Sequence, residues 1–397
     1  MIIWLLSDYD HRKHLAFKSL LARFSAAYPD SNIEFSVKSR HSLWESLFAH
    51  LRDPKRNPLA DVIEIPQNWT ELFSRLGLLS DLSSGLEALA RRHYPEFILK
   101  ELCREENSRA YSAPWWLEAP ALFYRPVALK GAVEDPDTEL ATWEGFRAAL
   151  DRVRLPAGRQ ARRGNFYGLS VPDSSGPVAV ADVLPRVWSR RGGLFSDDFN
   201  RATFSREETA GGIEDWLELA VSGKIELFSA DRFENGPRPA EDCAFIISSR
   251  KIQGSARSGL RMLPCPGYPS GGGLMLVYNL AVSASTRDHG AAAAFVTWVM
   301  EPRNVSAFAE SFGVFPCLKP VFEERLRDEK ETAVYRRLFS APELMPNIMV
   351  YPTAELLLER ALWNLSLKIA RGDYEREDLT RELIMAQAEA DYLLSLY

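Results

Sequence analysis

The sequence predicts an α/β protein built as two lobes, and two observations support this prediction. The chain has 397 residues, which exceeds the size at which a single hydrophobic core keeps growing. Near the N-terminus, short apolar segments typical of strands alternate with longer segments whose apolar residues recur at helical spacing. Strands that alternate with helices favour a parallel sheet covered by helices, so at least one α/β lobe is expected.

Three strands and two helices are predicted in the N-terminal part of the chain. The strands are expected at Ile2–Leu6, 32–37 and 61–65, where apolar and β-branched residues gather. The helix after the first strand has a single apolar stripe and ends before Pro29, and the next helix covers His41–Leu51. The stripe of the first helix consists of Phe17, Leu20, Leu21, Phe24 and Tyr28.

The rest of the chain continues the alternation of strands and helices. Thr142 is expected to cap a helix that runs through Leu150, because its side chain can accept from a free backbone N–H of the first turn. Another helix, around Val183 and Val187, is expected to end at Gly192-Gly193. The other expected elements are strands at Tyr167–Val171 and Cys243–Ser248, and helices at Ile213–Val221, Leu357–Ala370 and Leu379–Tyr392.

Charge and hydropathy argue against two classes of protein. The formal net charge of −6 disfavours a nucleic-acid partner, whose phosphates require a basic surface. No apolar stretch approaches the ~20 residues that a helix needs to span a bilayer. A protein without nucleic-acid partners and without membrane-spanning helices is therefore expected.

The N-terminus leaves two cellular locations open. The first six residues are apolar, but no basic segment precedes them and no small-residue cleavage site follows, so they do not form a signal peptide. If Met1 replaces an export signal that was removed, the protein is extracytoplasmic, in the periplasm or at the cell surface. If Met1 is the native start, the protein is cytoplasmic.

Motifs of catalysis and metal binding are missing from the sequence. It contains no nucleophile elbow, no zinc-protease motif, no phosphate-binding loop and no dinucleotide fingerprint. The four cysteines, Cys103, Cys243, Cys265 and Cys317, lack metal-ligand spacing and are expected to be buried free thiols. No catalytic residue, metal site or cofactor is therefore predicted. Paired carboxylates of a glycosidase stay open, because their separation of ~5–9 Å is a property of the folded chain.

An aromatic and acidic segment, Tyr111 to Arg125, is the strongest candidate for ligand binding. It contains Trp115, Trp116 and Glu118 directly before an apolar run. Neighbouring side chains of an extended strand point to opposite faces, so at least one of the two tryptophans is expected to lie outside the core of the sheet. A flat aromatic ring beside an acidic acceptor suits a polyhydroxylated ligand. The alternative is a buried tryptophan pair with a solvated Glu118.

This segment and four others resemble, in the same order, the carbohydrate-binding proteins that serve ABC importers. The four others resemble the family's strand–turn–helix with a "GLL-x-x-L" exit, its "TW-(D/E)-x-F" helix start, its "GG…WNLAIS" crossing and its C-terminal "G-Y-L-P" stretch. They are 60–69 with 76–82, 141–146, 271–283 and 292–316. Together they cover most of the chain, which is identified as a member of the extracellular solute-binding proteins that are similar to maltose-binding protein.

The resemblance implies a periplasmic-binding-protein fold of the type II-like class, with two discontinuous lobes joined by hinge crossings. The first lobe is expected at residues 1–111 and 281–320, and the second at 124–276 and 340–397. The hinge segments are expected at 112–123, 277–280 and 321–339.

The resemblance also implies which residues bind the ligand. Besides the tryptophan pair and Glu118, the expected ligand-binding residues lie in the loop after the first strand, in the loop after the third strand, in the diglycine and in the second crossing. They are Ser7, Asp8, Gln67, Asn68, Trp69, Gly192, Gly193 and Tyr278. Loops at the carboxyl ends of strands are where open α/β sheets bind ligands. Asn68 has an equally good alternative role, because Asn68-Trp69-Thr70-Glu71 reads as a helix N-cap with a capping glutamate.

The function that the resemblance implies is hinge closure on a sugar or oligosaccharide between the lobes, followed by delivery to the membrane subunits of an ABC permease. A monomer is expected. Met275, Leu276 and Val277 replace the small residues usual in the second crossing, which would narrow the cleft. The alternatives are a cytoplasmic sugar-sensing or partner-binding protein of the same fold and, less favoured, a glycosidase.

Overall fold

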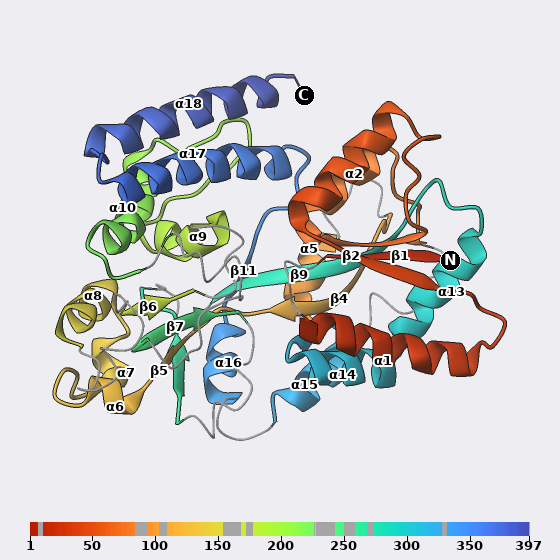
Figure 1. The fold of residues 1–397 in the computed structure, drawn as a ribbon, viewed down its shortest axis with the longest axis horizontal. Coiled ribbons are helices and arrows are strands. Elements are labelled where there is room, and N and C mark those ends of the chain that lie inside the picture. The colour runs from red at the N-terminus through yellow and green to blue at the C-terminus, as the bar shows by residue number, and fades with distance from the viewer. Residues whose placement is uncertain are drawn as a thin grey trace. The chain divides into compact units, whose positions relative to one another are not determined.

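The computed structural model describes the chain in eleven segments. They are residues 1–6, 11–83, 94–102, 109–153, 168–171, 178–225, 227, 243–249, 259–267, 273–327 and 332–396. The chain divides into two compact units (Figure 1). The first unit contains Met1–Glu118, Met275–Asp328 and Leu344–Tyr351, and the second contains Ala119–Leu274, Glu329–Glu343 and Pro352–Tyr397.

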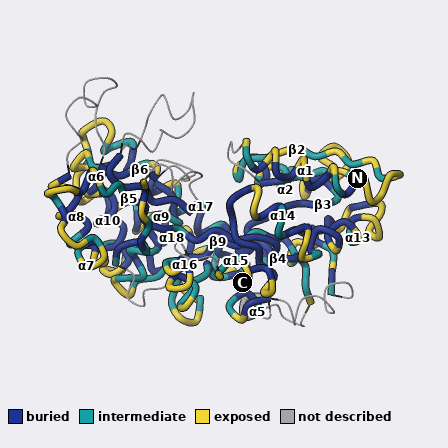
Figure 2. Tube along the Cα trace, turned by 90° about the horizontal axis from the view of Figure 1, so that it is seen from below, coloured by how far each residue is buried: buried dark blue, intermediate teal, exposed yellow. Residues whose placement is uncertain are grey.

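The described strands of the first unit belong to a seven-stranded sheet with the order β10-β4-β9-β3-β1-β2, in which β11 also pairs with β9. The strands of this sheet are β1 (Ile2–Leu6), β2 (Glu34–Lys38), β3 (Val62–Pro66), β4 (Ala113–Glu118), β9 (Gly273–Val282), β10 (Phe315–Pro316) and β11 (Pro342–Leu344). The first two residues of β9 and of β11 belong to the second unit. Every residue of β3 and β4 is buried, as the dark tube of Figure 2 shows for β4.

Helices cover both faces of this sheet. They are α1 (His11–Ala27), α2 (Arg40–Arg52), η1 (Gln67–Trp69), α3 (Thr70–Arg75), α5 (Glu96–Leu102), α13 (His289–Val299), α14 (Pro302–Phe312) and α15 (Lys319–Arg325). Figure 1 shows α1 beside α14 on one side of the sheet and α2 on the other. The apolar stripe of α1 is buried as predicted for Phe17, Leu20, Leu21 and Phe24, because this stripe packs against the sheet and α14.

The prediction of a parallel sheet holds only for part of the first unit. β1 pairs in parallel with β2 and with β3. β9 runs antiparallel to both β3 and β4, and β10 runs antiparallel to β4. The sheet is therefore mixed, parallel between β1 and its two neighbours and antiparallel where β9 and β10 pair.

The described strands of the second unit form a four-stranded sheet with the order β6-β7-β5-β8. The strands are β5 (Ala121–Tyr124), β6 (Leu169–Ser170), β7 (Phe245–Ser248) and β8 (Arg261–Pro264). The helices are α6 (Pro126–Leu129), α7 (Pro136–Glu139), α8 (Trp143–Arg152), α9 (Val180–Ser189), α10 (Glu207–Val221), α16 (Thr332–Leu338), α17 (Tyr351–Arg371) and α18 (Arg376–Leu394). Thr142 caps α8 as predicted, since its Oγ1 accepts from the N–H of Gly145 at 3.1 Å. The two predicted C-terminal helices are confirmed as α17 and α18, which lie side by side in Figure 1.

The prediction that the cysteines are buried free thiols is confirmed for the three that the structure describes. Cys243, Cys265 and Cys317 are buried free thiols. Cys103 lies outside the described residues.

Candidate functional site

A buried carboxylate, Glu64 on β3, is the centre of the polar contacts in the first unit. Its side chain is fully buried. One oxygen, Oε1, accepts hydrogen bonds from the indole N–H groups of Trp115 at 3.1 Å and Trp116 at 2.7 Å. The other oxygen, Oε2, accepts from the backbone N–H of Leu6 at 2.8 Å and from the ammonium of Lys13 at 2.5 Å. We call Lys13, Glu64, Trp115 and Trp116 the Glu64 cluster.

Lys13 enters this cluster from α1 and is only 2% exposed. Its Nζ also donates to the carbonyl oxygen of Leu6, so the last residue of β1 is bonded through both of its backbone groups. A buried charge is costly unless a partner of opposite charge and hydrogen bonds satisfy it. Lys13 and Glu64 meet this requirement for each other.

An aromatic stack adjoins the cluster. The rings of Trp116 and Tyr278 are nearly parallel, with centroids 4.0 Å apart and an interplanar angle of 9°. The Nζ of Lys13 lies 4.5 Å from the centroid of Trp116 and 5.5 Å from that of Tyr278. Phe312 meets Trp116 edge-on at 5.3 Å. Trp116 is buried but Tyr278 is only half-buried, so Tyr278 is the member of the stack that reaches the surface.

The expectation that one tryptophan lies outside the core is wrong, since Trp115 is 0% and Trp116 1% exposed. The reason is an irregularity in β4. The register with β9 shifts between Pro114 and Trp116, so Trp115 is an extra residue and the alternation of faces is interrupted. Both indoles consequently reach the same oxygen of Glu64. The alternative of a solvated Glu118 is also wrong, because Glu118 is only 2% exposed.

The loop after β3 carries three sequence-predicted residues, Gln67, Asn68 and Trp69, which form the short helix η1 and are all buried. The predicted helix cap by Asn68 is wrong. Asn68 lies inside η1, and its Nδ2 donates to the Sδ of Met345 at 3.7 Å. The N–H of Glu71 in the first turn of α3 is satisfied instead by Oδ1 of Asn347 at 3.0 Å.

This loop and the neighbouring strand β9 hold polar atoms that lack hydrogen-bond partners. Among the described residues, none bonds the buried Nε2 of Gln67, the buried Nε1 of Trp69 or the buried Oδ1 of Asn279. The Nδ2 of Asn279 donates to Ser112 Oγ at 2.8 Å, so only the oxygen of this amide is unsatisfied. Buried polar groups are nearly always bonded, so each exception calls for an explanation such as a ligand. The indole nitrogens of Trp143 and Trp216 in the second unit are unsatisfied in the same sense.

Backbone register places the unsatisfied loop next to the aromatic stack. In the antiparallel pair of β3 and β9, Pro66 is opposite Tyr278. Gln67 follows Pro66 directly. One edge of the first unit therefore carries both an aromatic ring at the surface and buried donors without partners.

The diglycine of the second unit is explained by helix packing. A Cβ at Gly192 would lie 2.8 Å from the backbone N of Thr209 in α10, so a side chain does not fit there. The hydroxyl of Thr209 accepts from the N–H of Gly193 at 3.2 Å and donates to its carbonyl oxygen at 2.8 Å. The turn is therefore held close to α10 whether or not it also meets a ligand.

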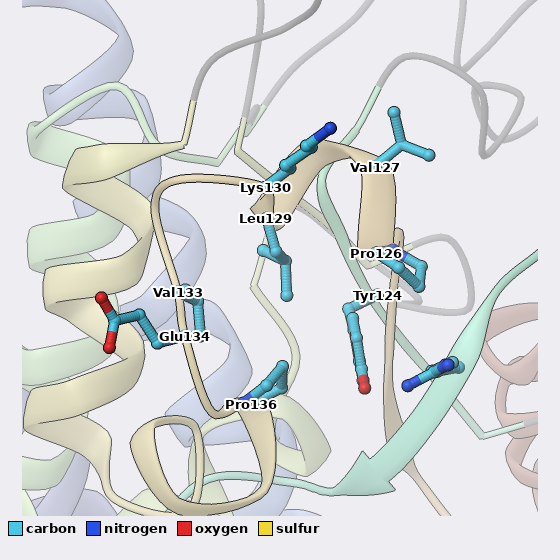
Figure 3. Close-up of a pocket in the computed structure, with 9 residues that line it drawn as sticks. Tyr124, Pro126, Val127, Leu129, Lys130, Val133, Glu134 and Pro136 are labelled. Carbon is cyan, nitrogen blue, oxygen red and sulfur yellow. The ribbon is translucent and has the colours of Figure 1, made fainter.

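A separate pocket of about 400 Å³ lies in the second unit (Figure 3). Its lining is Tyr124, Pro126, Val127, Leu129, Lys130, Val133, Glu134, Pro136 and Arg261. In Figure 3 the ammonium of Lys130 and the carboxylate of Glu134 point away from Tyr124. None of the sequence-predicted ligand residues lines it, and we do not place the site there.

Two sequence-predicted residues, Ser7 and Asp8, lie outside the described residues. In the part of the chain that the structure describes, no group of histidine, cysteine, aspartate and glutamate side chains could hold a metal ion. Within the same residues, no helix is long and apolar enough to cross a bilayer.

Sequence reasoning missed Lys13 and Glu64, although a signal for each was present. Glu64 is the one charged residue within the buried strand Val62–Pro66. Lys13 lies one helical turn before Phe17, on the apolar stripe of its helix. An acidic residue in a buried strand and a basic residue on a buried helix face predict an ion pair between them.

Comparison with known proteins agrees with this architecture. The chain shares the fold of the GacH receptor of Streptomyces glaucescens, solved unliganded and with acarbose, at a TM-score of 0.75 and 16% identity over 98% of both chains. It also shares the fold of T. maritima MalE3 bound to maltose, at a TM-score of 0.76 and 17% identity over 99% of both chains. The Thermus thermophilus maltotriose binding protein, bound with maltotriose, gives 0.76 and 16% over 99% of both chains.

No curated protein sequence matches the chain. Residues 19–333, which are most of it, match the family model of bacterial extracellular solute-binding proteins. The chain therefore belongs to the family of bacterial extracellular solute-binding proteins.

Proposed function

We propose that this protein binds a sugar or oligosaccharide and supplies it to an ABC importer. The observation that carries the proposal is the edge of the first unit where Tyr278, half-buried, adjoins the unsatisfied donors of Gln67 and Trp69. A sugar presents an apolar ring face and several hydroxyls, so it needs both an aromatic surface and hydrogen-bond partners. The proteins of similar fold that bind maltose, maltotriose and acarbose support the same class of ligand.

Within this site the loop after β3 supplies polar contacts and β9 supplies the stacking ring. Gln67 Nε2 and Trp69 Nε1 would each donate to a sugar hydroxyl, which would satisfy them. Asn68 lies between these two residues and contributes its amide. Tyr278 would stack on the sugar ring, and Trp116 beneath it would support that ring.

The remaining sequence-predicted residues join the proposal with less specific roles. Glu118, at the end of β4, would accept from a hydroxyl, and Trp115 would act through Glu64. Ser7, Asp8, Gly192 and Gly193 stay predictions from the resemblance. A permease partner, a monomeric state and a location outside the cytoplasm accompany the proposal, and the family's description as extracellular supports the location.

A carbohydrate panel that contains maltose, maltotriose and acarbose tests the proposal. At one hundred times its Kd, a ligand should add about 2.7 kcal/mol to the free energy of unfolding. Tryptophan fluorescence should change with the same saturating dose dependence, because Trp69 and Trp116 lie at the site. Saturation distinguishes binding from the general stabilisation by excluded sugars, which keeps rising with concentration.

Two outcomes would favour the alternatives. If no carbohydrate shifts the melting temperature but a purified partner protein does, a partner-binding protein is the better explanation. If a bound oligosaccharide is cleaved over time, as chromatography would reveal, the protein is a glycosidase. The hinge closure that the resemblance implies predicts a smaller radius of gyration in small-angle scattering when the ligand is added.

A further inference from the structure

The carboxylate of Glu64 joins three strands of the first unit, β1, β3 and β4, and a ring stack adds a fourth strand, β9. Glu64 itself is on β3, Leu6 ends β1, and Trp115 and Trp116 are on β4. β9 lies between β3 and β4 in the sheet, and its Tyr278 is joined to the cluster through the stack on Trp116. The proposed ligand residues of this unit lie on these strands or in the loops that directly follow them. The cluster therefore contacts every strand that carries or precedes a proposed ligand residue of this unit.

Stability alone gives a weak reason for such a cluster. Two charges must leave water, and buried ion pairs can often be replaced by apolar side chains of similar size without loss of stability. Their best-attested benefit is to specify one arrangement among several. The contacts of Lys13 and Glu64 therefore matter most for the side chains that they hold in one orientation.

The ring of Trp116 is the side chain that these contacts orient most clearly. Its Nε1 is bonded to Glu64 at 2.7 Å, the edge of Phe312 meets it at 5.3 Å, and Lys13 Nζ lies 4.5 Å from its centroid. The half-buried Tyr278 lies parallel to this ring, with the two centroids 4.0 Å apart. The indole is fixed at its nitrogen and over its rings, so the plane of Tyr278 is set by the plane of Trp116.

We propose that Glu64, together with Lys13, is the positioning residue of the sugar-stacking ring of Tyr278, and that it acts through the buried Trp116 beneath that ring. This inference rests on the proposed function. Glu64 does not touch the ligand. It fixes the two indoles by accepting from both N–H groups, and Lys13 neutralises its charge and fixes the end of β1 through Leu6.

The test compares two double variants that both remove the ion pair. In Lys13→Met/Glu64→Met, no acceptor is left for the indoles, yet the core keeps similar volume. In Lys13→Met/Glu64→Gln, the amide oxygen can still accept from Trp115 and Trp116. Its nitrogen takes the place of Oε2 and cannot accept, so the N–H of Leu6 loses its acceptor in both double variants. Maltotriose is the probe ligand in isothermal titration, and near-ultraviolet circular dichroism reports the packing of the rings.

The methionine double variant should lower the urea midpoint, because two buried indole N–H groups and both backbone groups of Leu6 lose their partners. It should also bind maltotriose at least tenfold more weakly. Its near-ultraviolet dichroism should lose intensity in the tryptophan region. The glutamine double variant should recover the dichroism and the affinity, with affinity within about threefold of the wild type. Phe24→Leu is the matched control, because Phe24 is buried in the same unit against Phe295 and Trp298. It should lower the midpoint and leave the affinity unchanged.

Unchanged affinity and dichroism in the methionine double variant would overturn the inference. Equal losses in both double variants would also overturn it, because the acceptor oxygen would then not be what matters. If the wild type binds no carbohydrate, the proposed function fails, but the dichroism of the two variants still decides whether Glu64 orients the rings.

Discussion

Replacing Tyr278 by alanine separates a binding role from a packing role at the most exposed ring of the site. A fully buried aromatic side chain costs ~3–5 kcal/mol of stability when it is truncated to alanine. Tyr278 is half-buried, with one face covered by Trp116 at 4.0 Å, so we expect a loss of about 2 kcal/mol in the free energy of unfolding. The stack makes this cost larger than the sequence alone suggests.

The same substitution should weaken carbohydrate binding by more than ~1 kcal/mol, because it removes the ring that stacks on the sugar. This corresponds to at least a fivefold rise in Kd. Isothermal titration with the tightest ligand of the panel measures the loss, and urea denaturation of the ligand-free protein measures the stability. Tyr278→Phe is the matched control, since it keeps the stack on Trp116 and removes only the hydroxyl.

The outcome that refutes a ligand role is a loss of stability with normal binding in Tyr278→Ala. The phenylalanine variant should preserve stability and most of the affinity. If it loses as much affinity as the alanine variant, the hydroxyl rather than the ring carries the interaction. Tyr278 would then belong to the polar part of the site.

Three further predictions follow from single residues. Glu118→Gln should keep the fold and weaken sugar binding by about 1.5–3 kcal/mol, the range of a hydrogen bond to a charged group, and unchanged titration curves would remove Glu118 from the site. Gly192→Ala should lower stability by about 1–3 kcal/mol, because its Cβ would lie 2.8 Å from the N of Thr209, while Gly193→Ala should change it by less than about 0.5 kcal/mol; equal urea midpoints would contradict this packing argument. Burial and a nearby carboxylate raise the pKa of Cys265 from 9.0 to about 12, so its stabilising contribution is complete below pH 9 and is lost as the pH rises towards 12. Cys265→Ala should therefore reduce the fall in the urea midpoint over this interval, and an unchanged slope would argue against it.

Elements whose signals are local could be predicted from the sequence. The stripe of Phe17, Leu20, Leu21 and Phe24 predicted a buried helix face, because one helical period decides which side meets the sheet. Thr142 predicted the start of α8, because a cap bonds a backbone group only three residues away. Gly77, just after α3, is a signal of the same local kind, because its φ of 69° is the left-handed turn for which glycine is suited.

Features that depend on distant segments could not be predicted in the same way. The first turn of α3 is bonded by Asn347 rather than by the adjacent Asn68, since Leu344–Tyr351 belongs to the first unit and brings this amide to the helix. The register shift at Trp115 depends on how β4 pairs with β9, which local periodicity does not encode. The prediction that assigned the two tryptophans to opposite faces failed for this reason.

The Glu64 cluster shows where the limit of sequence reasoning lies for the site itself. A glutamate in a buried strand and a lysine on an apolar helix face together predict an ion pair, and parallel pairing of β1 with β3 brings these segments close. The tryptophans that complete the cluster are 51 and 52 residues from Glu64, and both reach it only because β4 contains an extra residue. The carboxylate therefore accepts hydrogen bonds from two neutral indoles as well as from the charged Lys13. Lys13 alone would balance the charge of Glu64, so the indoles are not needed for that purpose. The acceptor oxygen is needed to hold two indoles in one orientation, which is why the glutamine double variant, without any charge, should still support the site.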